Sequence, residues 1–168
     1  MRARLAMYYS RINYEHREIA LRDRPEQLYK ISSKGTVPAL ELQTGRVIDE
    51  SFEIMQWAIS QNDQKKWFYN SKKEQLEAVS VNDFQFKKWL DKYKYHVRYP
   101  ENSKKFYRSK CEKILEKYEE VLHGSNNLFG HQVSLGDMAL MPFIRQFANV
   151  DIIRFNDVFV NLSNWLEQ

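Results

Sequence analysis

Thr36-Val37-Pro38-Ala39-Leu40 is the stretch that decides the fold, and Glu50-Ser51 follows it, with Glu50 thirteen residues after Val37. The apolar residues around Pro38 predict a strand over 36–42, with the proline near its start, where a missing backbone donor is tolerated. Glu50-Ser51 opens an apolar run, which predicts a helix that begins there. The strand and the helix start are therefore separated only by a short connection.

The residues of this connection predict a hairpin. Gln43-Thr44-Gly45-Arg46 is typical of a turn in which Gly45 adopts a positive φ angle. Val47 and Ile48 then form a short return strand. The following helix has acids in its first turn, which favour a helix N-terminus. Its apolar residues are dense enough to predict burial: Phe52, Ile54, Met55, Trp57, Ala58 and Ile59.

Three further elements are expected upstream of the hairpin. Apolar residues at helical spacing predict a short helix over 3–10, although the basic start of the chain is also typical of a transit peptide. Alternation near Ile19 and Leu21 predicts a short strand over 15–21. Asp23-Arg24-Pro25 predicts a turn or a helix start, since a proline at a first helical position loses no needed donor.

The polar run 60–66 predicts a domain boundary, beyond which the chain is almost entirely helical. We expect a first domain over 1–60, a linker over 61–73 and an all-helical domain over 74–168. Tyr99-Pro100 should end a first long helix, and Ser103 and His123-Gly124 should bound a second. Their apolar stripes are Leu76, Val79, Phe86, Leu90, Tyr93 and Val97, and then Tyr107, Cys111, Ile114, Leu115, Tyr118 and Leu122.

Ser134-Leu135-Gly136-Asp137 has the spacing of a helix capping box, with Asp137 in place of the usual Glu or Gln. The Ser134 hydroxyl is expected to accept a hydrogen bond from the Asp137 amide, while the carboxylate reaches back to the Ser134 amide. The apolar run 138–144 behind the box predicts a central helix, which Pro142 should kink.

Several residues of the helical part leave alternatives open. Asp83 lies on the first apolar stripe, where it either pairs with a basic neighbour or caps a break in the helix, or else belongs to a polar site between the domains. Cys111 lies in the middle of the second stripe, where an unexposed thiol acts as a small hydrophobe. Trp89, Tyr93 and Tyr95 either belong to the core or line a substrate pocket.

Composition places the chain among ordinary globular proteins. Of its 168 residues, 43% are hydrophobic and 29% are charged, and the formal net charge is +4. The single cysteine excludes an internal disulfide framework and fits a reducing compartment. No apolar run approaches the roughly 18 residues of a membrane span, so no membrane partner is expected. Acids interrupt the densest basic stretch, residues 104–117, which predicts a solvated helix surface and no nucleic-acid partner.

Spacing alone reveals no catalytic constellation. His16, His96, His123 and His131 are never three or four residues apart, and the one cysteine is far from them, so no metal site is expected. The sequence also contains neither a phosphate-binding glycine loop nor a GxSxG nucleophile motif.

Taken together, the motifs resemble those of the glutathione S-transferases. Thr36–Leu40 with Glu50-Ser51 is similar to the glutathione site of that family, and the Ser134–Asp137 box is similar to the capping box of its helical domain. The resemblance covers essentially the whole chain and is nearest to bacterial members with a cysteine- or serine-type site. It implies an α+β thioredoxin-like N-terminal domain, incomplete because its first strand is missing, and an all-α C-terminal domain.

The resemblance also implies a set of glutathione-binding residues. Pro38 is expected to be cis, so that the main chain of Val37 pairs with the cysteinyl unit. Glu50 and Ser51 are expected to hold the γ-glutamyl end, with the ammonium at Glu50 and the carboxylate at the hydroxyl and the helix N-terminus. Arg24 matches the position of a lysine that faces the glycine carboxylate. Glutathione is thus the expected co-substrate, a hydrophobic small molecule is the other ligand, and no metal is implied.

In this family, a strand and a loop with the cysteine, serine or tyrosine that acts on the glutathione sulfur precede the helix that residues 1–5 resemble. The chain is therefore expected to begin just after its catalytic residue. Either the protein starts upstream of Met1, or the gene is a remnant, or another segment replaces the first strand. The expected function is a cytoplasmic, dimeric glutathione transferase that conjugates or reduces a hydrophobic electrophile. The alternative is a non-catalytic scaffold or regulatory protein with the same fold.

Overall fold

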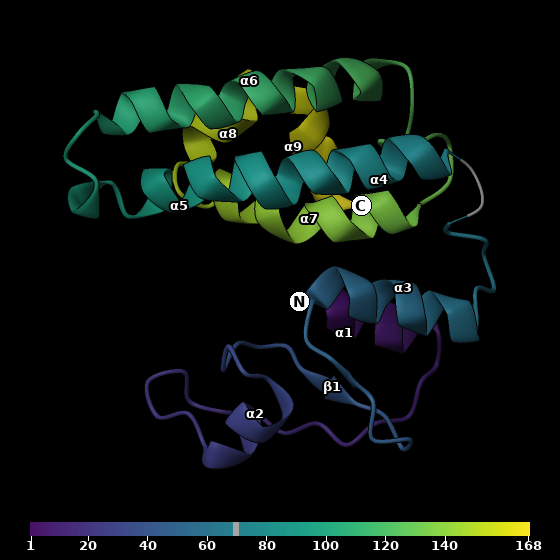
Figure 1. Ribbon diagram of the computed structural model, residues 1–168. Coiled ribbons are helices and arrows are strands. Elements are labelled where there is room, and N and C mark those ends of the chain that lie inside the picture. The colour runs from purple at the N-terminus through teal and green to yellow at the C-terminus, as the bar shows by residue number, and fades with distance from the viewer. Residues whose placement is uncertain (69–70) are drawn as a thin grey trace. The chain divides into compact units, whose positions relative to one another are not determined.

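The computed structural model describes residues 1–68 and 71–168, which form two compact units, Met1–Trp67 and Phe68–Gln168 (Figure 1). The described part of the first unit combines helices with one hairpin, whereas that of the second is helical. The domain limits expected at residues 60 and 74 stay predictions. Each unit is described by itself.

In the first unit, α1 (Arg2–Tyr9) packs against α3 (Ser51–Gln61), and α2 (Glu26–Ile31) begins after Pro25. Strands β1 (Leu40–Glu41) and β2 (Val47–Ile48) pair antiparallel, with Leu40 opposite Ile48. The predicted helix over 3–10, the turn with positive φ at Gly45 and the helix start at Ser51 are confirmed. The buried apolar residues are Ala3, Ala6, Met7, Leu28, Ile48, Ile54, Met55, Ala58, Ile59 and Trp67.

The strand predicted over 15–21 is wrong. The described backbone has only an isolated bridge between Ala20 and Asp23 at this place, and residues 13–19 have no regular secondary structure. A strand forms when its amide and carbonyl groups pair with a neighbouring strand, and no described strand pairs with this segment. The strand predicted over 36–42 is likewise reduced to the two residues that pair with β2.

The segment after α3 folds back onto α1. The Tyr9 hydroxyl donates to Asp63 Oδ1 at 2.8 Å and accepts from the Lys65 amide at 2.6 Å, while the Tyr9 and Trp67 rings stack with centroids 3.7 Å apart. Burial, reinforced by the hydrogen bond to Asp63, raises the pKa of Tyr9 to about 12, so this donor stays protonated at neutral pH. These contacts close the first unit.

The second unit is a helical bundle (Figure 1). α4 (Lys72–Val81), a π-helical turn η1 (Asn82–Phe86) and α5 (Lys87–Lys94) form one continuous rod. A 3₁₀ turn η2 (His96–Arg98) leads to α6 (Lys104–His123), which packs against α5. α7 (Leu135–Ala148) packs against α4, and α8 (Ile152–Val158) and α9 (Val160–Glu167) complete the bundle.

The predicted stripe of the first long helix is only partly right. Its four central residues are buried, but Leu76 is exposed and the neighbouring Gln75 is buried instead, because its side-chain oxygen accepts a hydrogen bond from the Gly136 amide at 2.8 Å. Val97 is 82% exposed, since the helix ends at Lys94. Asp83 lies within the π-helical turn, and its Oδ1 accepts a hydrogen bond from the side-chain Nδ2 of Asn82 at 2.8 Å.

The capping box at the start of α7 is present and buried. Asp137 N donates to the Ser134 hydroxyl at 3.2 Å, and the Asp137 carboxylate accepts from the amides of Ser134 at 2.9 Å and Leu128 at 2.8 Å. Burial raises the pKa of Asp137, and these hydrogen bonds oppose that shift. A single carboxylate thus joins the preceding loop to the central helix.

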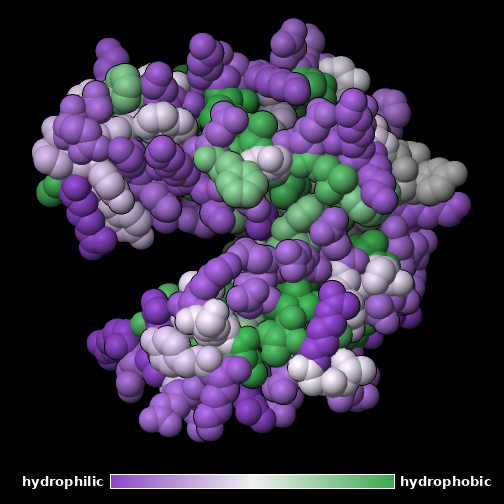
Figure 2. Space-filling model, in the orientation of Figure 1, coloured by the Kyte–Doolittle hydropathy of each residue, from purple (hydrophilic) through white to green (hydrophobic). Residues whose placement is uncertain are grey.

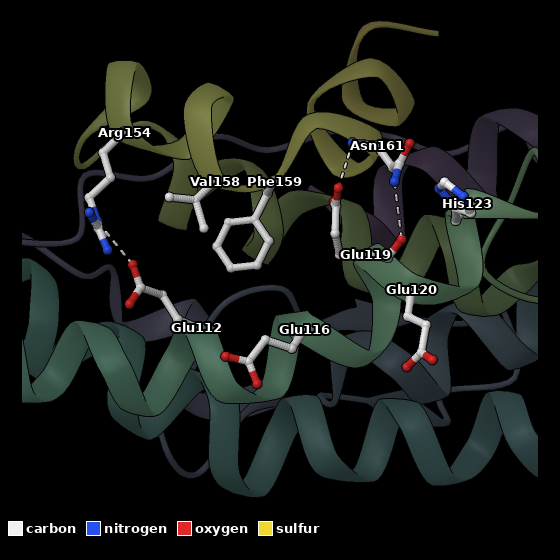
Figure 3. Close-up of a pocket in the computed structure, with 9 residues that line it drawn as sticks. All are labelled: Glu112, Glu116, Glu119, Glu120, His123, Arg154, Val158, Phe159 and Asn161. Atoms are coloured by element: carbon white, nitrogen blue, oxygen red, sulfur yellow. Dashed lines mark hydrogen bonds and ion pairs between the residues drawn. The ribbon is translucent and has the colours of Figure 1, made fainter.

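A second carboxylate caps α9 from a neighbouring helix. Glu119 on α6 accepts from the backbone amide of Asn161 at 2.8 Å (Figure 3) and from that of Leu162, also at 2.8 Å. These two amides belong to the first turn of α9, where a helix lacks internal acceptors. Glu119 therefore fixes the C-terminal helix on α6.

Cys111 belongs to the core, in agreement with the expected hydrophobic role. It is buried on the inner face of α6, and burial, with a smaller effect of Glu112, raises the pKa of its thiol to about 12. Among the described residues, no helix is both long and apolar enough to cross a bilayer.

Replacement of Asp137 should destabilise the protein strongly. Asp137→Ala leaves the buried amides of Ser134 and Leu128 without acceptors, at about 1–3 kcal/mol each, so the free energy of unfolding should fall by about 2–5 kcal/mol in a urea titration. Asp157→Ala, at an exposed position of α8, is the matched control and should change it by less than about 0.5 kcal/mol. Equal effects of the two variants would contradict this assignment.

The Cys111 thiol should be inert in the native protein. A thiol with a pKa of about 12 is uncharged at pH 8, and only a thiolate attacks a disulfide reagent such as dithiodipyridine, breaking its S–S bond and releasing thiopyridone. We expect the reaction to be slow without denaturant and to accelerate in parallel with unfolding. Rapid stoichiometric labelling of the native chain would show that the cysteine is accessible.

Candidate functional site

The site predicted from the sequence centres on the start of α3. Ser51 is the first residue of this helix, and Arg2 Nε donates to its hydroxyl oxygen at 2.9 Å. Arg2 is only 3% exposed and its guanidinium also lies 5.7 Å from the centre of the Phe52 ring. A buried guanidinium retains its charge, so a fixed positive group stands beside Ser51.

Glu50, the residue before α3, lies beside a second cation. Lys34 Nζ donates to Glu50 Oε1 at 2.9 Å, and both side chains are more than half exposed. This hydrogen bond is the main reason that the pKa of Lys34 is raised. Because the pair is solvated, it contributes little to stability and can exchange its partners for a ligand.

The N-terminus of α3 has no side-chain cap among the residues that the structure describes. Glu50 is the N-cap residue, but its side chain makes no capping hydrogen bond. The first amides of a helix attract anions, through hydrogen bonding and through the partial positive charge of the helix end. Ser51, the α3 amides and the Arg2 guanidinium together favour a carboxylate at this place, next to the acidic Glu50.

The hairpin brings the proline motif to the same end of the unit. The Val37–Pro38 peptide bond is cis, as expected. Pro38 lies two residues before Leu40 and Glu50 two residues after Ile48, so the register of the Leu40–Ile48 pair places both at one end of the hairpin. Val37 is exposed, and its main chain precedes the strand rather than pairing within it.

A tight turn leads into this motif. Gly35 has a φ angle of +58°, its amide donates to the Ser32 carbonyl at 2.8 Å, and a Cβ at this position would collide with the Tyr29 ring. Only glycine fits such a turn without strain. Gly35 therefore sets the path of the chain between Lys34 and Val37.

Arg24 is placed in the turn before α2. Its Nε donates to the Leu21 carbonyl at 3.2 Å, and its side chain is exposed. Within residues 1–68 and 71–168, no hydrogen bond or ion pair joins Arg24 to Val37, Glu50 or Ser51. Its predicted role stays a prediction.

Sequence reasoning missed two side chains of this site, Arg2 and Lys34. Both are cations just before a predicted element, and nothing in their spacing relates Lys34 to Glu50, 16 residues away, or Arg2 to Ser51, 49 residues away. The one signal for Arg2 is its place on the inner face of α1, beside Ala3 and Ala6. An arginine on an apolar helix face indicates a buried partner.

The second unit has a surface cavity of about 580 Å³ between α6, α8 and α9 (Figure 3). Several of its charges already have partners: Glu112 pairs with Arg154 at 3.1 Å, and Glu119 caps α9. The lining residues are Glu112, Glu116, Glu119, Glu120, His123, Arg154, Val158, Phe159 and Asn161. In the described part of the chain, no group of three His, Cys, Asp or Glu side chains could hold a metal ion.

Trp89, Tyr93 and Tyr95 do not line this cavity. Tyr93 is buried in the core, and Trp89 stacks on Tyr107 with ring centroids 6.5 Å apart. Tyr95 is 45% exposed at the end of α5.

Comparison with known proteins gives a consistent result. Residues 1–66 match the family model described as glutathione S-transferase, N-terminal domain. None of the curated proteins matches the sequence. Glutathione transferase URE2P6 from Phanerochaete chrysosporium, solved with oxidized glutathione, superposes with a TM-score of 0.84 at 17% identity, over 99% of this chain and 83% of that one.

Two bacterial structures are also similar. BphK, a bacterial glutathione S-transferase solved as a ternary complex, has a TM-score of 0.83 at 19% identity, over 99% of this chain and 86% of its own. A class Gtt2 glutathione S-transferase of Vibrio parahaemolyticus has a TM-score of 0.77 at 22% identity, with the same coverage. The expected thioredoxin-like and helical fold class is thereby confirmed: the chain has the fold of the glutathione S-transferases, and its residues 1–66 match the N-terminal domain of that family.

Proposed function

We propose that this protein binds glutathione in its first unit, at the start of α3 and the neighbouring proline motif. It then either conjugates the glutathione to a hydrophobic electrophile or uses the glutathione to reduce that electrophile. The observation that carries the proposal is the pair of oppositely charged groups at the α3 start, Arg2 at Ser51 and Glu50 beside it. A zwitterionic γ-glutamyl group has one carboxylate and one ammonium on the same carbon, and it fits such a pair.

The γ-glutamyl carboxylate would accept hydrogen bonds from the Ser51 hydroxyl and the α3 amides, with the Arg2 guanidinium behind them. Its ammonium would replace the Lys34 ammonium at Glu50. The Val37 main chain, turned outward by the cis bond to Pro38, would pair with the cysteinyl unit, and Arg24 would face the glycine carboxylate.

The match of residues 1–66 to the glutathione S-transferase N-terminal domain and the similar P. chrysosporium structure, solved with oxidized glutathione, support glutathione as the ligand. No metal is part of the proposal, since each recognised group of glutathione meets a side chain or an amide.

A second candidate is a non-catalytic protein that keeps the fold and binds glutathione or a protein partner. One observation bears on it: Cys111, the single cysteine, is buried and burial raises its pKa to about 12, which rules out this thiol, but not a serine or tyrosine hydroxyl, as the group that acts on the glutathione sulfur. Turnover of a chlorinated aromatic substrate with glutathione separates the two candidates. Conjugate formation by the chain supports the transferase, whereas binding without turnover supports the second function.

The proposal extends to a homodimer in the cytoplasm, as the family resemblance implies. Light scattering coupled to size-exclusion chromatography tests the dimer, and a monomer at all concentrations would refute it.

Glutathione binding should depend on Glu50 and Ser51. Loss of a hydrogen bond to a charged group costs about 1.5–3 kcal/mol, so Glu50→Gln and Ser51→Ala should each weaken binding by about 10–100-fold in titration calorimetry. Ser60→Ala, on the same helix but hydrogen-bonded to the Trp57 carbonyl, is the matched control and should bind normally.

A truncated ligand locates the contact. Cysteinylglycine lacks the γ-glutamyl unit, so its weaker binding should be the same in wild type, Glu50→Gln and Ser51→Ala. Because Glu50 is exposed, Glu50→Gln should melt at the wild-type temperature, which separates a binding defect from unfolding. Unchanged glutathione affinity in Glu50→Gln would contradict the proposed site.

A further inference from the structure

The charge of the chain is concentrated in one short stretch. Residues 87–110, which we call the basic hairpin end, contain nine Lys or Arg and two acids, so they carry +7. Since the whole chain carries +4, the other residues together carry −3. The stretch comprises α5, η2 and the start of α6, at the end of the α5–α6 hairpin (Figure 1).

Most of these cations have no acidic partner. Lys92 pairs with Glu101 at 2.8 Å, and Arg108 pairs with Glu112 and Asp151. Within residues 1–68 and 71–168, the remaining seven form no ion pair: Lys87, Lys88, Lys94, Arg98, Lys104, Lys105 and Lys110. The positive charge is therefore available to an external anion.

The structure gathers the basic side chains around aromatic rings. Lys88, Lys92 and Lys110 each lie 5.9 Å from the Trp89 ring centre, although they come from two helices. Phe106 packs edge-on against Trp89 at 6.4 Å. Near the turn, Lys94 and Arg98 flank Tyr95 at 5.1 and 5.0 Å. Cations from α5, η2 and α6 are thus close together in space and form one basic surface.

Apolar side chains project from the same end. Val97 on η2 is 82% exposed, Tyr95 is 45% exposed and Phe106 is 37% exposed. They belong to three consecutive elements around the turn between α5 and α6. In Figure 2, hydrophilic side chains cover most of this end of the helical unit, with paler ones among them.

We propose that the basic hairpin end docks peripherally on a membrane surface that contains anionic phospholipids. Lys and Arg are attracted to the negative headgroups, tyrosine favours the interface, and an exposed valine gains from insertion among the acyl chains. Such docking needs no spanning helix.

A nucleic acid would use the same charge but fits less well. Sequence-tolerant nucleic-acid binding relies on free aromatic faces for base stacking, and the Trp89 ring already has three lysine ammonium groups around it. An exposed valine also contributes nothing to the binding of a phosphate backbone.

Co-sedimentation of the full chain with vesicles tests the proposal. We expect binding to vesicles of phosphatidylglycerol and phosphatidylcholine, and not to phosphatidylcholine alone. Each lysine near an anionic surface contributes about 1 kcal/mol, which is a little over fivefold in the partition coefficient. Loss of two lysines in the double variant K105Q/K110Q should therefore lower the partition coefficient about 30-fold. K113Q/K117Q, with the same charge loss further along α6, is the control and should retain binding.

Val97→Ser separates membrane from nucleic acid. It should weaken vesicle binding about tenfold, as expected for loss of a buried aliphatic side chain, and leave binding of a single-stranded oligonucleotide unchanged. Equal binding to neutral vesicles, equal loss in both double variants, or an oligonucleotide affinity above that for vesicles would each overturn the proposal. Glutathione binding is measured in parallel and should be normal in all these variants.

Discussion

The hydrogen bond from the buried Arg2 guanidinium to the Ser51 hydroxyl is the constraint on which the first unit and its site depend. Arg2 is 3% exposed, and a guanidinium taken out of water needs hydrogen-bond acceptors, of which the Ser51 hydroxyl is one. The bond joins α1 to the first residue of α3, whose inner faces share the Ala3, Ala6, Met55 and Ala58 core. The position of the Ser51 hydroxyl is therefore set by helix packing and not by a mobile loop.

Much of the fold follows from local patterns. The hairpin turn at Gly45, the start of α3 and the capping box at Ser134 each depend on residues within four positions of one another, and the structure contains all three. The strand over 15–21 failed for the opposite reason: alternation indicates a strand only where a partner strand exists. The predicted burial of Val97 is wrong because the helix ends at Lys94, and that of Leu76 is wrong because Gln75 takes the buried position.

The candidate site divides in the same way. Glu50, Ser51, Val37 and Pro38 were predicted from a motif that is nearly contiguous in sequence, whereas Arg2 and Lys34 were not, since only the tertiary fold brings them to α3. The basic surface could not be predicted from the sequence for the same reason. Acids interrupt the basic residues along the chain, but α5 and α6 lie antiparallel and bring Lys88, Lys92 and Lys110 around one tryptophan.

Nitrogen–proton correlation spectra recorded during a glutathione titration test the central claim most directly. The account predicts saturable shifts of the Val37 and Ser51 backbone amides and of the Arg2 Nε–H resonance, because these groups would contact the cysteinyl and γ-glutamyl units. Resonances of residues around the cavity between α6 and α9, such as Glu120, should stay unchanged. No shift at Ser51 and Arg2 at saturating glutathione, or shifts confined to the second unit, would contradict it.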